Sequence, residues 1–315
     1  MEEKIKDQNG EELIDLDEEG NPLPIKKEKK QDSSKSYERI LTIFLSTILL
    51  FLLIKIFIFN KGRKTFLKFK TSEDIYYNIS EAIVNFIRQK PNARIGLSYD
   101  ESMKGLYDYL VDRYENGEVS FKDVSFYSLD GICGLKKDNN NSYYYALNES
   151  FLSKIDVQEK NIFLIKEEGY MLFDYDNNAE EYDDILRENP IDLQILNVGE
   201  DGNIGFIDEN TDFDLYSNII KLSPKKRIKM KNTTFISLEK TPIYAITQGI
   251  KNILQSKEII LIAMGKDKAE GINNLMNGAF TTELPITALI TYTGKLTIYS
   301  DEEAGSLIKE LYKKF

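Results

Sequence analysis

A turn that is rich in glycine and carboxylates follows an apolar run at residues 193–198. It carries Asp201, Asn203 and Asp208 shortly after the end of that run. In a parallel α/β sheet, ligands bind at the carboxyl ends of the strands, so these side chains would face a crevice and meet a polar ligand there. An Asp-Gly pair is also typical of a surface turn, and the residues alone favour that simpler interpretation.

A second carboxylate ends another apolar segment. Residues 124–127 are predicted to form a strand, and Asp130 follows them, with Gly131 directly after it. A carboxylate at the end of a strand can act as a general base when burial raises its pKa. The alternative is a residue that merely ends the strand in a turn, and the residues alone favour this alternative.

Three blocks taken in order, residues 129–135, 198–206 and 242–269, resemble a known family. The first is similar to the segment Phe-Asn-x-Asp-Glu-Tyr-x-Gly-Leu of the glucosamine-6-phosphate deaminase/isomerase family, whose relatives are the 6-phosphogluconolactonases. The second is similar to that family's turn Gly-x-Asp-Gly-His-Ile-Ala-Phe-Asn-Glu. The resemblance covers about residues 72–313 and implies an α/β fold, a Rossmann-like three-layer parallel sheet.

The resemblance implies catalytic positions for Asp130, Asp201 and Asp208. Asp130 takes the place of the aspartate that moves a proton between C1 and C2 of an open-chain amino sugar. Asp201 takes the place of the turn aspartate, and Asp208 that of a glutamate that is one methylene longer. Asn203 replaces the family histidine, which serves ring opening, and an amide cannot exchange a proton near neutral pH.

The resemblance also implies ligand-binding positions at Ser102, Arg227 and Lys268. In the family, a Gly/Ser-Gly-x-Thr-Pro loop holds the sugar phosphate, and Ser102 takes the place of its threonine. Asp100 and Glu101 replace the glycines, and two carboxylates repel a phosphate dianion. Arg227 and Lys268 are the candidate phosphate-binding cations. Each of these two is also explained as a lysine or arginine on an exposed face.

Composition excludes several classes of function. The chain of 315 residues has 52 Asp and Glu against 41 Lys and Arg, and a net charge of −11. This acidic balance argues against nucleic-acid binding, which needs a basic surface. Cys133 is the only cysteine and the chain has no histidine. A zinc site, a disulfide within the chain and a Ser-His-Asp nucleophile are therefore not expected, and no cofactor or metal is predicted.

The first 60 residues differ in composition from the rest. Residues 1–39 are rich in charge and poor in apolar residues, which predicts a disordered tail, cytoplasmic or external. Residues 40–59 are mainly Ile, Leu and Phe, with Lys55 as the one charged residue, and a helix of this length spans roughly 30 Å, the thickness of a bilayer core. The sequence thus predicts a transmembrane helix at 40–60 that contacts the lipid bilayer. Basic residues flank it on both sides, so the side of the globular domain stays undetermined, with a slight preference for the cytoplasm.

A basic linker is predicted at 61–71, and a deaminase-like α/β domain at 72–315. Strands and helices alternate in this region, which predicts a parallel sheet that helices cover on both faces. Expected strands lie at 94–97, 124–127, 193–198, 258–264, 286–290 and 296–299. Expected helices begin at Ser72 and at residues 103, 143, 180, 242, 266 and 304.

These features predict a single-pass cell-membrane protein with a non-catalytic domain, a pseudoenzyme that binds or regulates a sugar, a sugar phosphate or a protein partner. The alternative is an active sugar or sugar-phosphate isomerase or deaminase with an altered substrate, which uses Asp130 as its base. A third possibility is a surface-exposed membrane interaction protein. Asp100 and Glu101 favour the loss of phosphosugar binding, whereas Asp130 and Lys268 favour a retained pocket.

Overall fold

The computed structural model describes Thr42 and residues 64–209 and 211–309. The chain divides into two units, Met1–Ile58 and Phe59–Phe315, and every helix and strand named below belongs to the second. The predicted tail at 1–39 lies outside the described residues, and so does the predicted transmembrane helix at 40–60, apart from Thr42.

The predicted localisation at the cell membrane is corrected. Within the described residues, no helix is both long enough and apolar enough to cross a bilayer. The expected contact with lipid through residues 40–59 gains no support from this part of the chain, and membrane localisation is not carried further.

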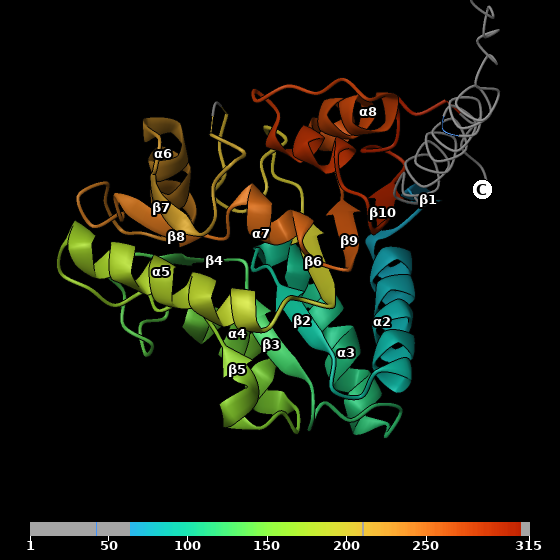
Figure 1. The fold of residues 1–315 in the computed structure, drawn as a ribbon, viewed down its shortest axis with the longest axis horizontal. Coiled ribbons are helices and arrows are strands. Elements are labelled where there is room, and N and C mark those ends of the chain that lie inside the picture. The colour runs from blue at the N-terminus through green and yellow to red at the C-terminus, as the bar shows by residue number, and fades with distance from the viewer. Residues whose placement is uncertain (1–41, 43–63, 210, 310–315) are drawn as a thin grey trace, which may run out of the picture. The chain divides into compact units, whose positions relative to one another are not determined.

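In the described part of the chain, seven strands form a parallel central sheet in the order β1-β10-β9-β6-β2-β3-β5 (Figure 1). This confirms the predicted α/β class with a parallel sheet. Because parallel strands share one carboxyl edge, the loops after β2, β3 and β6 meet there. The strands are β1 (Lys64–Phe69), β2 (Arg94–Leu97), β3 (Ser125–Ser128), β5 (Ile162–Phe163), β6 (Leu193–Asn197), β9 (Glu258–Ala263) and β10 (Lys295–Asp301).

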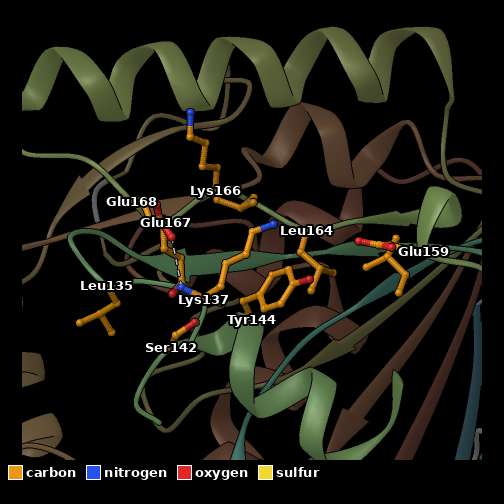
Figure 2. Close-up of a pocket in the computed structure, with 11 residues that line it drawn as sticks. Leu135, Lys137, Ser142, Tyr144, Glu159, Leu164, Lys166, Glu167 and Glu168 are labelled. Atoms are coloured by element: carbon orange, nitrogen blue, oxygen red, sulfur yellow. Dashed lines mark hydrogen bonds between the residues drawn. The ribbon is translucent and has the colours of Figure 1, made fainter. Parts of the chain in front are cut away.

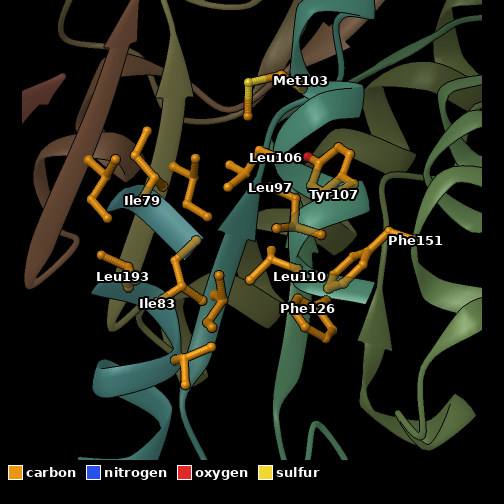
Figure 3. Close-up of a cluster of buried hydrophobic side chains, with 14 of the residues drawn as sticks. Ile79, Ile83, Leu97, Met103, Leu106, Tyr107, Leu110, Phe126, Phe151 and Leu193 are labelled. Carbon is orange, nitrogen blue, oxygen red and sulfur yellow. The ribbon is translucent and has the colours of Figure 1, made fainter. Parts of the chain in front are cut away.

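Helices cover both faces of this sheet, as the inner strand β9 shows. Ile260 and Ile262 join a core that α2 (Ser72–Gln89) and α3 (Lys104–Glu115) cover (Figure 3). The intervening Ile259 and Leu261 join a second core, with α7 (Ile250–Leu254) and α8 (Ala269–Asn277). Such a strand, buried on both faces, needs a continuous apolar sequence, and β9 has one.

Helix α2 illustrates how the local sequence sets an element. Thr71 caps it, because its hydroxyl accepts a hydrogen bond from the Asp74 amide at 3.1 Å. Acidic residues in the first turn stabilise the helix further, because their negative charges interact favourably with the positive end of the helix dipole. This capping residue lies directly before Ser72, the residue at which the sequence predicted the helix to begin. The residues that α2 buries include Ile75, Ile79, Ile83 and Ile87, spaced four apart.

A second, smaller sheet has antiparallel pairings and the order β4-β8-β7. Its strands are β4 (Asp130–Ile132), β7 (Asn218–Lys221) and β8 (Tyr244–Thr247). The predicted helix at 242–254 is wrong in its first half. Tyr244–Thr247 is rich in residues that favour strands, and the helix begins only at Ile250, after Gly249.

Further elements differ from the prediction. Residues 304–307, expected to begin a helix, form turns. Residues 286–290, expected as a strand, lie in the 3₁₀ helix η5 (Pro285–Ile290). The prediction failed because a short, largely buried apolar run shows no periodicity that distinguishes a helix from a strand. Residues 64–69, expected within the basic linker 61–71, form the edge strand β1 instead. β1 pairs with β10 from Lys64 to Phe69.

Four other elements complete the surroundings of the site. Helix α4 (Tyr143–Ser150) and the 3₁₀ helix η1 (Glu101–Met103) follow the first strands. Helix α5 (Leu172–Glu188) follows β5, and Figure 1 shows it running below the smaller sheet. Helix α6 (Pro224–Thr233) packs on the smaller sheet through Met230.

Candidate active site

A cavity of about 780 Å³ lies at the carboxyl edge of the central sheet. The loops after β2 and β6, the start of β4, the first turn of α4 and one side of α6 enclose it. Four residues predicted from the sequence line it together: Asp130, Asp201, Asn203 and Asp208. The structure therefore brings together side chains that are up to 78 positions apart in the sequence, as the position of the sheet edge requires.

Asp130 is the buried carboxylate of this cavity, with 6% of its surface exposed. It starts β4, where it pairs with Thr247 of β8. Gly205 lies so close that a Cβ there would be 2.6 Å from Asp130 Oδ2. Among the described residues, no side chain forms a hydrogen bond or an ion pair with this carboxylate.

The pKa of Asp130 is raised to about 8. Burial is the main cause, because it disfavours the charged form, and the nearby carboxylates of Glu167 and Asp100 act in the same direction. Lys226 opposes the shift. A carboxyl group with such a pKa holds its proton near neutral pH yet can give it up, as a general acid–base residue must.

The turn after β6 fixes Asn203. The side-chain Nδ2 of Asn203 donates a hydrogen bond to the backbone carbonyl of Gly205 at 3.0 Å. The backbone carbonyl of Asn203 accepts a hydrogen bond from the backbone amide of Gly199 at 2.9 Å. Gly199 leaves room for this side chain, since a Cβ at this position would lie 1.9 Å from Asn203 Oδ1 and would force the amide to move. Gly202 and Gly205 adopt positive φ angles of 66° and 55°, which a glycine accepts without strain.

Helix α6 places a row of lysines opposite the acidic turn. Ser223 caps the helix by accepting a hydrogen bond from the Lys226 amide, and Pro224 follows at the first position. The ion pairs are Lys225–Asp201 at 2.8 Å, Lys226–Asp208 at 2.6 Å and Lys229–Glu200 at 2.6 Å. The carboxylates of the turn are therefore each held by a lysine.

The loop after β2 contributes both signs of charge. Asp100 Oδ1 accepts a hydrogen bond from the Ser102 amide at 2.9 Å and so caps η1. Glu101 pairs with Lys104 at 2.6 Å. Asp100, Glu101 and Lys104 line the cavity, whereas Ser102 is not among its lining residues. The two carboxylates that replace the family's glycines therefore line the cavity, and Lys104 lies beside them.

The two predicted phosphate-binding cations contact other groups in the structure, and their role in binding phosphate stays a prediction. Arg227 donates hydrogen bonds to the carbonyls of Leu238 at 2.8 Å, Thr241 at 3.0 Å and Pro242 at 3.1 Å. It ties α6 to the following loop. Lys268 forms an ion pair with its neighbour Asp267. Neither Arg227 nor Lys268 lines the cavity.

Aromatic side chains form one wall of the cavity, which the sequence did not indicate. Tyr143 stacks on Phe206, with ring centroids 5.6 Å apart and an angle of 21° between the planes. Tyr99 lies against Tyr143 at 5.4 Å. Binding cavities commonly combine such apolar walls with a few polar groups.

Glu167 lies behind Asp130 and was also missed. A Cβ at Gly131 would lie 2.9 Å from Glu167 Cγ, so the absence of a side chain at Gly131 makes room for it. Its Oε1 accepts a hydrogen bond from the Tyr143 amide at 2.9 Å. Burial raises the pKa of Glu167 to about 7. Figure 2 shows it lining a neighbouring cavity of about 330 Å³, together with residues of α4 such as Tyr144.

The parallel sheet and the buried carboxyl group at its carboxyl edge define an α/β protein whose cavity lies where such sheets usually bind ligands. Residues 69–298 match the family of glucosamine-6-phosphate isomerases/6-phosphogluconolactonase. The chain belongs to this family. The family predicted from the sequence is thereby confirmed, whereas its description as a degenerate, membrane-anchored member is not shown.

Relatives and solved structures agree with this membership. The glucosamine-6-phosphate deaminase of Thermoanaerobacter pseudethanolicus is 32% identical over 239 residues, which cover 76% of this chain and 92% of the relative. That of Lysinibacillus sphaericus is 35% identical over 229 residues, 71% of this chain and 95% of the relative.

A monomeric glucosamine-6-phosphate deaminase superposes with a TM-score of 0.72 and 28% identity, covering 77% of this chain and 99% of that structure. The 6-phosphogluconolactonase of Trypanosoma brucei, at 17% identity and a TM-score of 0.66, covers 79% of this chain and 100% of that structure, and shows the shared fold alone.

The comparisons correct the expected function. The prediction of a non-catalytic binding or regulatory protein was wrong, because relatives that match over most of their length are named as deaminases. The related expectation that the chain is not an enzyme loses its support for the same reason. A protein partner and a surface-exposed membrane role also gain no support and are not carried further.

Proposed function

We propose that this chain is an active isomerase or deaminase of an amino-sugar phosphate, with Asp130 as its base. The observation that carries the proposal is the Asp130 carboxyl group, which is buried at the floor of the cavity, free of an ion pair within the described residues and raised in pKa to about 8. The names of the relatives supply the reaction class and the sugar phosphate.

The proposed reaction begins with an open-chain 2-amino aldose. Asp130 removes the proton from C2, and the electron pair of that bond forms a C1–C2 double bond while the aldehyde oxygen takes up a proton. The protonated carboxyl group then returns its proton to C1, which leaves a protonated imine at C2. Water adds to the imine carbon and ammonia departs, so that the products are a ketose phosphate and ammonia. One carboxyl group serves as base and then as acid.

The remaining lining suits the two ends of such a substrate. Lys225, Lys226 and Lys229 present positive charge from one side of α6, and a phosphate would compete with the carboxylates that now hold them. Tyr143 and Phe206 offer an apolar wall to the carbon skeleton. The proposal assigns the phosphate to α6, since Arg227 and Lys268 do not line the cavity.

Ammonia release from glucosamine 6-phosphate tests the proposal. At low enzyme concentration, where the chemical step limits the rate, Asp130→Asn should reduce the rate by about 10²–10⁴-fold. Asp184→Asn is a matched control, because Asp184 is an exposed aspartate of α5 that pairs with Arg187. Equal rates for wild type and Asp130→Asn, or no ammonia release by the wild type above the blank, would contradict the proposal.

A further inference from the structure

A cyclic amino sugar demands two separate proton transfers from an isomerase. The ring must first open, which takes a proton from the hydroxyl at C1 and delivers one to the ring oxygen. The open chain then loses its C2 proton and gains one at C1. A substrate that cannot form a ring needs the second transfer alone. The number of usable acid–base groups in the cavity therefore bears on the class of substrate that it accepts.

Among the carboxyl groups that line the cavity, one is free of a hydrogen-bonding or ionic partner within the described residues and so available for these two tasks. Apart from Asp130, each carboxylate that lines it is held by a cation or by a backbone amide. Asp208 has a lysine nitrogen 2.6 Å from its Oδ1, and Asp201, with 65% of its side chain exposed, is held by a lysine at 2.8 Å. The others are Glu200 with Lys229, Glu101 with Lys104, and Asp100 with the Ser102 amide.

Asn203 cannot supply the missing transfer. It lies in the turn beside the cavity, but an amide neither accepts nor releases a proton near neutral pH. Its side chain is also engaged, since Nδ2 donates to the Gly205 carbonyl and Oδ1 lies against Gly199. The chain has no histidine that another element could bring to this place.

We infer that this site acts on phosphorylated aldehydes or ketones that reach it with the carbonyl group already open, and that it does not open sugar rings. The inference rests on the proposed function and narrows its substrate class. Substrates of this class are short-chain aldose phosphates with a hydroxyl or amino group at C2, and the ketose phosphates to which they isomerise, whose phosphate occupies the oxygen that would close the ring. A cyclic sugar phosphate is used only as fast as it opens by itself in solution.

The dependence of the rate on enzyme concentration tests this inference with the unmodified full chain. Erythrose 4-phosphate cannot close a ring on C1, because O4 carries the phosphate, whereas glucosamine 6-phosphate is cyclic. The rate at which the C2 proton exchanges in D₂O, monitored by NMR, should rise linearly with enzyme concentration for erythrose 4-phosphate. For glucosamine 6-phosphate it should reach a plateau at the rate of spontaneous ring opening. A linear rise for both probes would overturn the inference and leave the proposed function standing.

Two further measurements locate the cause. The wild type should not accelerate the interconversion of the anomers of glucosamine 6-phosphate, which requires ring opening, and an acceleration would overturn the inference. Asn203→His should raise the plateau at least about tenfold. A plateau that persists in a variant with the wild-type melting temperature would overturn the role given to Asn203. If the variant does not fold, the two wild-type measurements decide. Exchange with neither probe would overturn the proposed function itself.

Discussion

At the scale of residues, Asp130 depends on groups that the sequence places far from it. Gly205 closes over its carboxylate, Glu167 lies behind it and Lys226 faces it from α6. The sequence predicted Asp130 at the end of a strand, because the apolar residues before it indicate where that strand lies. Its burial was not predictable, since that depends on how three distant segments pack.

The candidate phosphate-binding residues show a different limit of the sequence prediction. Within the run Lys225-Lys226-Arg227, successive side chains point about 100° apart around a helix. Predicting which of them binds phosphate therefore requires knowing which face of the helix meets the cavity. Spacing favoured Arg227, whose face meets backbone carbonyls of the following loop. Lys225, Lys226 and Lys229 line the cavity, and Lys225 and Lys229, spaced four apart, lie on one face of the helix. The spacing of four residues indicates two lysines on one helix face, but the sequence alone does not show that this face of α6 points toward the cavity.

The pH dependence of catalysis follows from the pKa of Asp130. As a base, Asp130 must be deprotonated, so kcat/KM should rise with pH and level off above a pKa of about 8. The Glu167 carboxylate raises this pKa, so Glu167→Gln should move the rise to lower pH. The measurement is kcat/KM for C2 proton exchange from erythrose 4-phosphate between about pH 5.5 and pH 9.5.

Glu168→Gln is the control for this shift, because Glu168 is the exposed neighbour of Glu167. Its profile should coincide with that of the wild type. A Glu167→Gln profile that also coincides with the wild type would show that the Glu167 charge does not act on Asp130. A wild-type kcat/KM that is already level at about pH 5.5, as expected for an aspartate with its usual pKa near 4, would show that burial does not govern the proposed base.

At the scale of elements, periodic patterns succeeded and isolated short runs did not. Helix α2 follows from its buried isoleucines at every fourth position and from its acidic first turn. β8 and η5 are short runs of apolar residues, for which helix and strand patterns coincide. In both cases tertiary pairing decides the conformation, and β8 gains it from partners at residues 130–132 and 218–221.

Asp192 joins several elements at the opposite edge of the sheet from the cavity. Its side chain is 1% exposed and pairs with Lys90 at 2.5 Å, Lys257 at 2.8 Å and Arg94 at 3.2 Å. Burial acts to raise the pKa of Asp192, but hydrogen bonds from these three cations outweigh it and hold that pKa well below its usual range. The residue links the end of α2, the start of β2 and the chain just before β9.

Asp192→Asn should lower the free energy of unfolding by about 3 kcal/mol, since it leaves three cations without their shared anion. Urea denaturation at pH 7 measures the loss. The loss should shrink as the pH falls below about 4, because a lowered pKa stabilises the fold only where the unfolded aspartate is ionised. The exposed aspartate of α5 gives the control, as Asp184→Asn should cost less than about 0.5 kcal/mol. Similar losses in both variants would refute this role of Asp192.

At the scale of the whole molecule, the alternation of strands and helices predicted the parallel sheet and the edge that carries the site. The smaller antiparallel sheet was not predictable, because its strands are short and come from three distant parts of the chain. This second sheet carries Asp130 on β4 and supports α6. The part that sequence reasoning missed is therefore the part that closes the cavity.

The boundary of the globular domain is the remaining whole-molecule expectation. The sequence predicted residues 72–315, yet β1 extends the central sheet and contributes to both cores: Phe66 packs on one face, and Leu67 and Phe69 on the other. Phe69 also stacks on Tyr299 of β10, with ring centroids 5.9 Å apart. Without β1, the β10 edge would lose its partner along the whole register from residue 64 to residue 69.

A chain that starts at residue 62 should therefore be more stable than one that starts at residue 72. Three half-buried apolar side chains together contribute roughly 3 kcal/mol, and the lost strand hydrogen bonds add to this. Urea denaturation of the two chains measures the difference, and light scattering should show more association in the shorter chain, whose β10 edge is open. Lys68→Ala in the longer chain is the control, because Lys68 is exposed, and it should change the stability by less than about 0.5 kcal/mol. Equal unfolding midpoints for the two chains would place the boundary at residue 72 and make β1 an addition that the fold does not need.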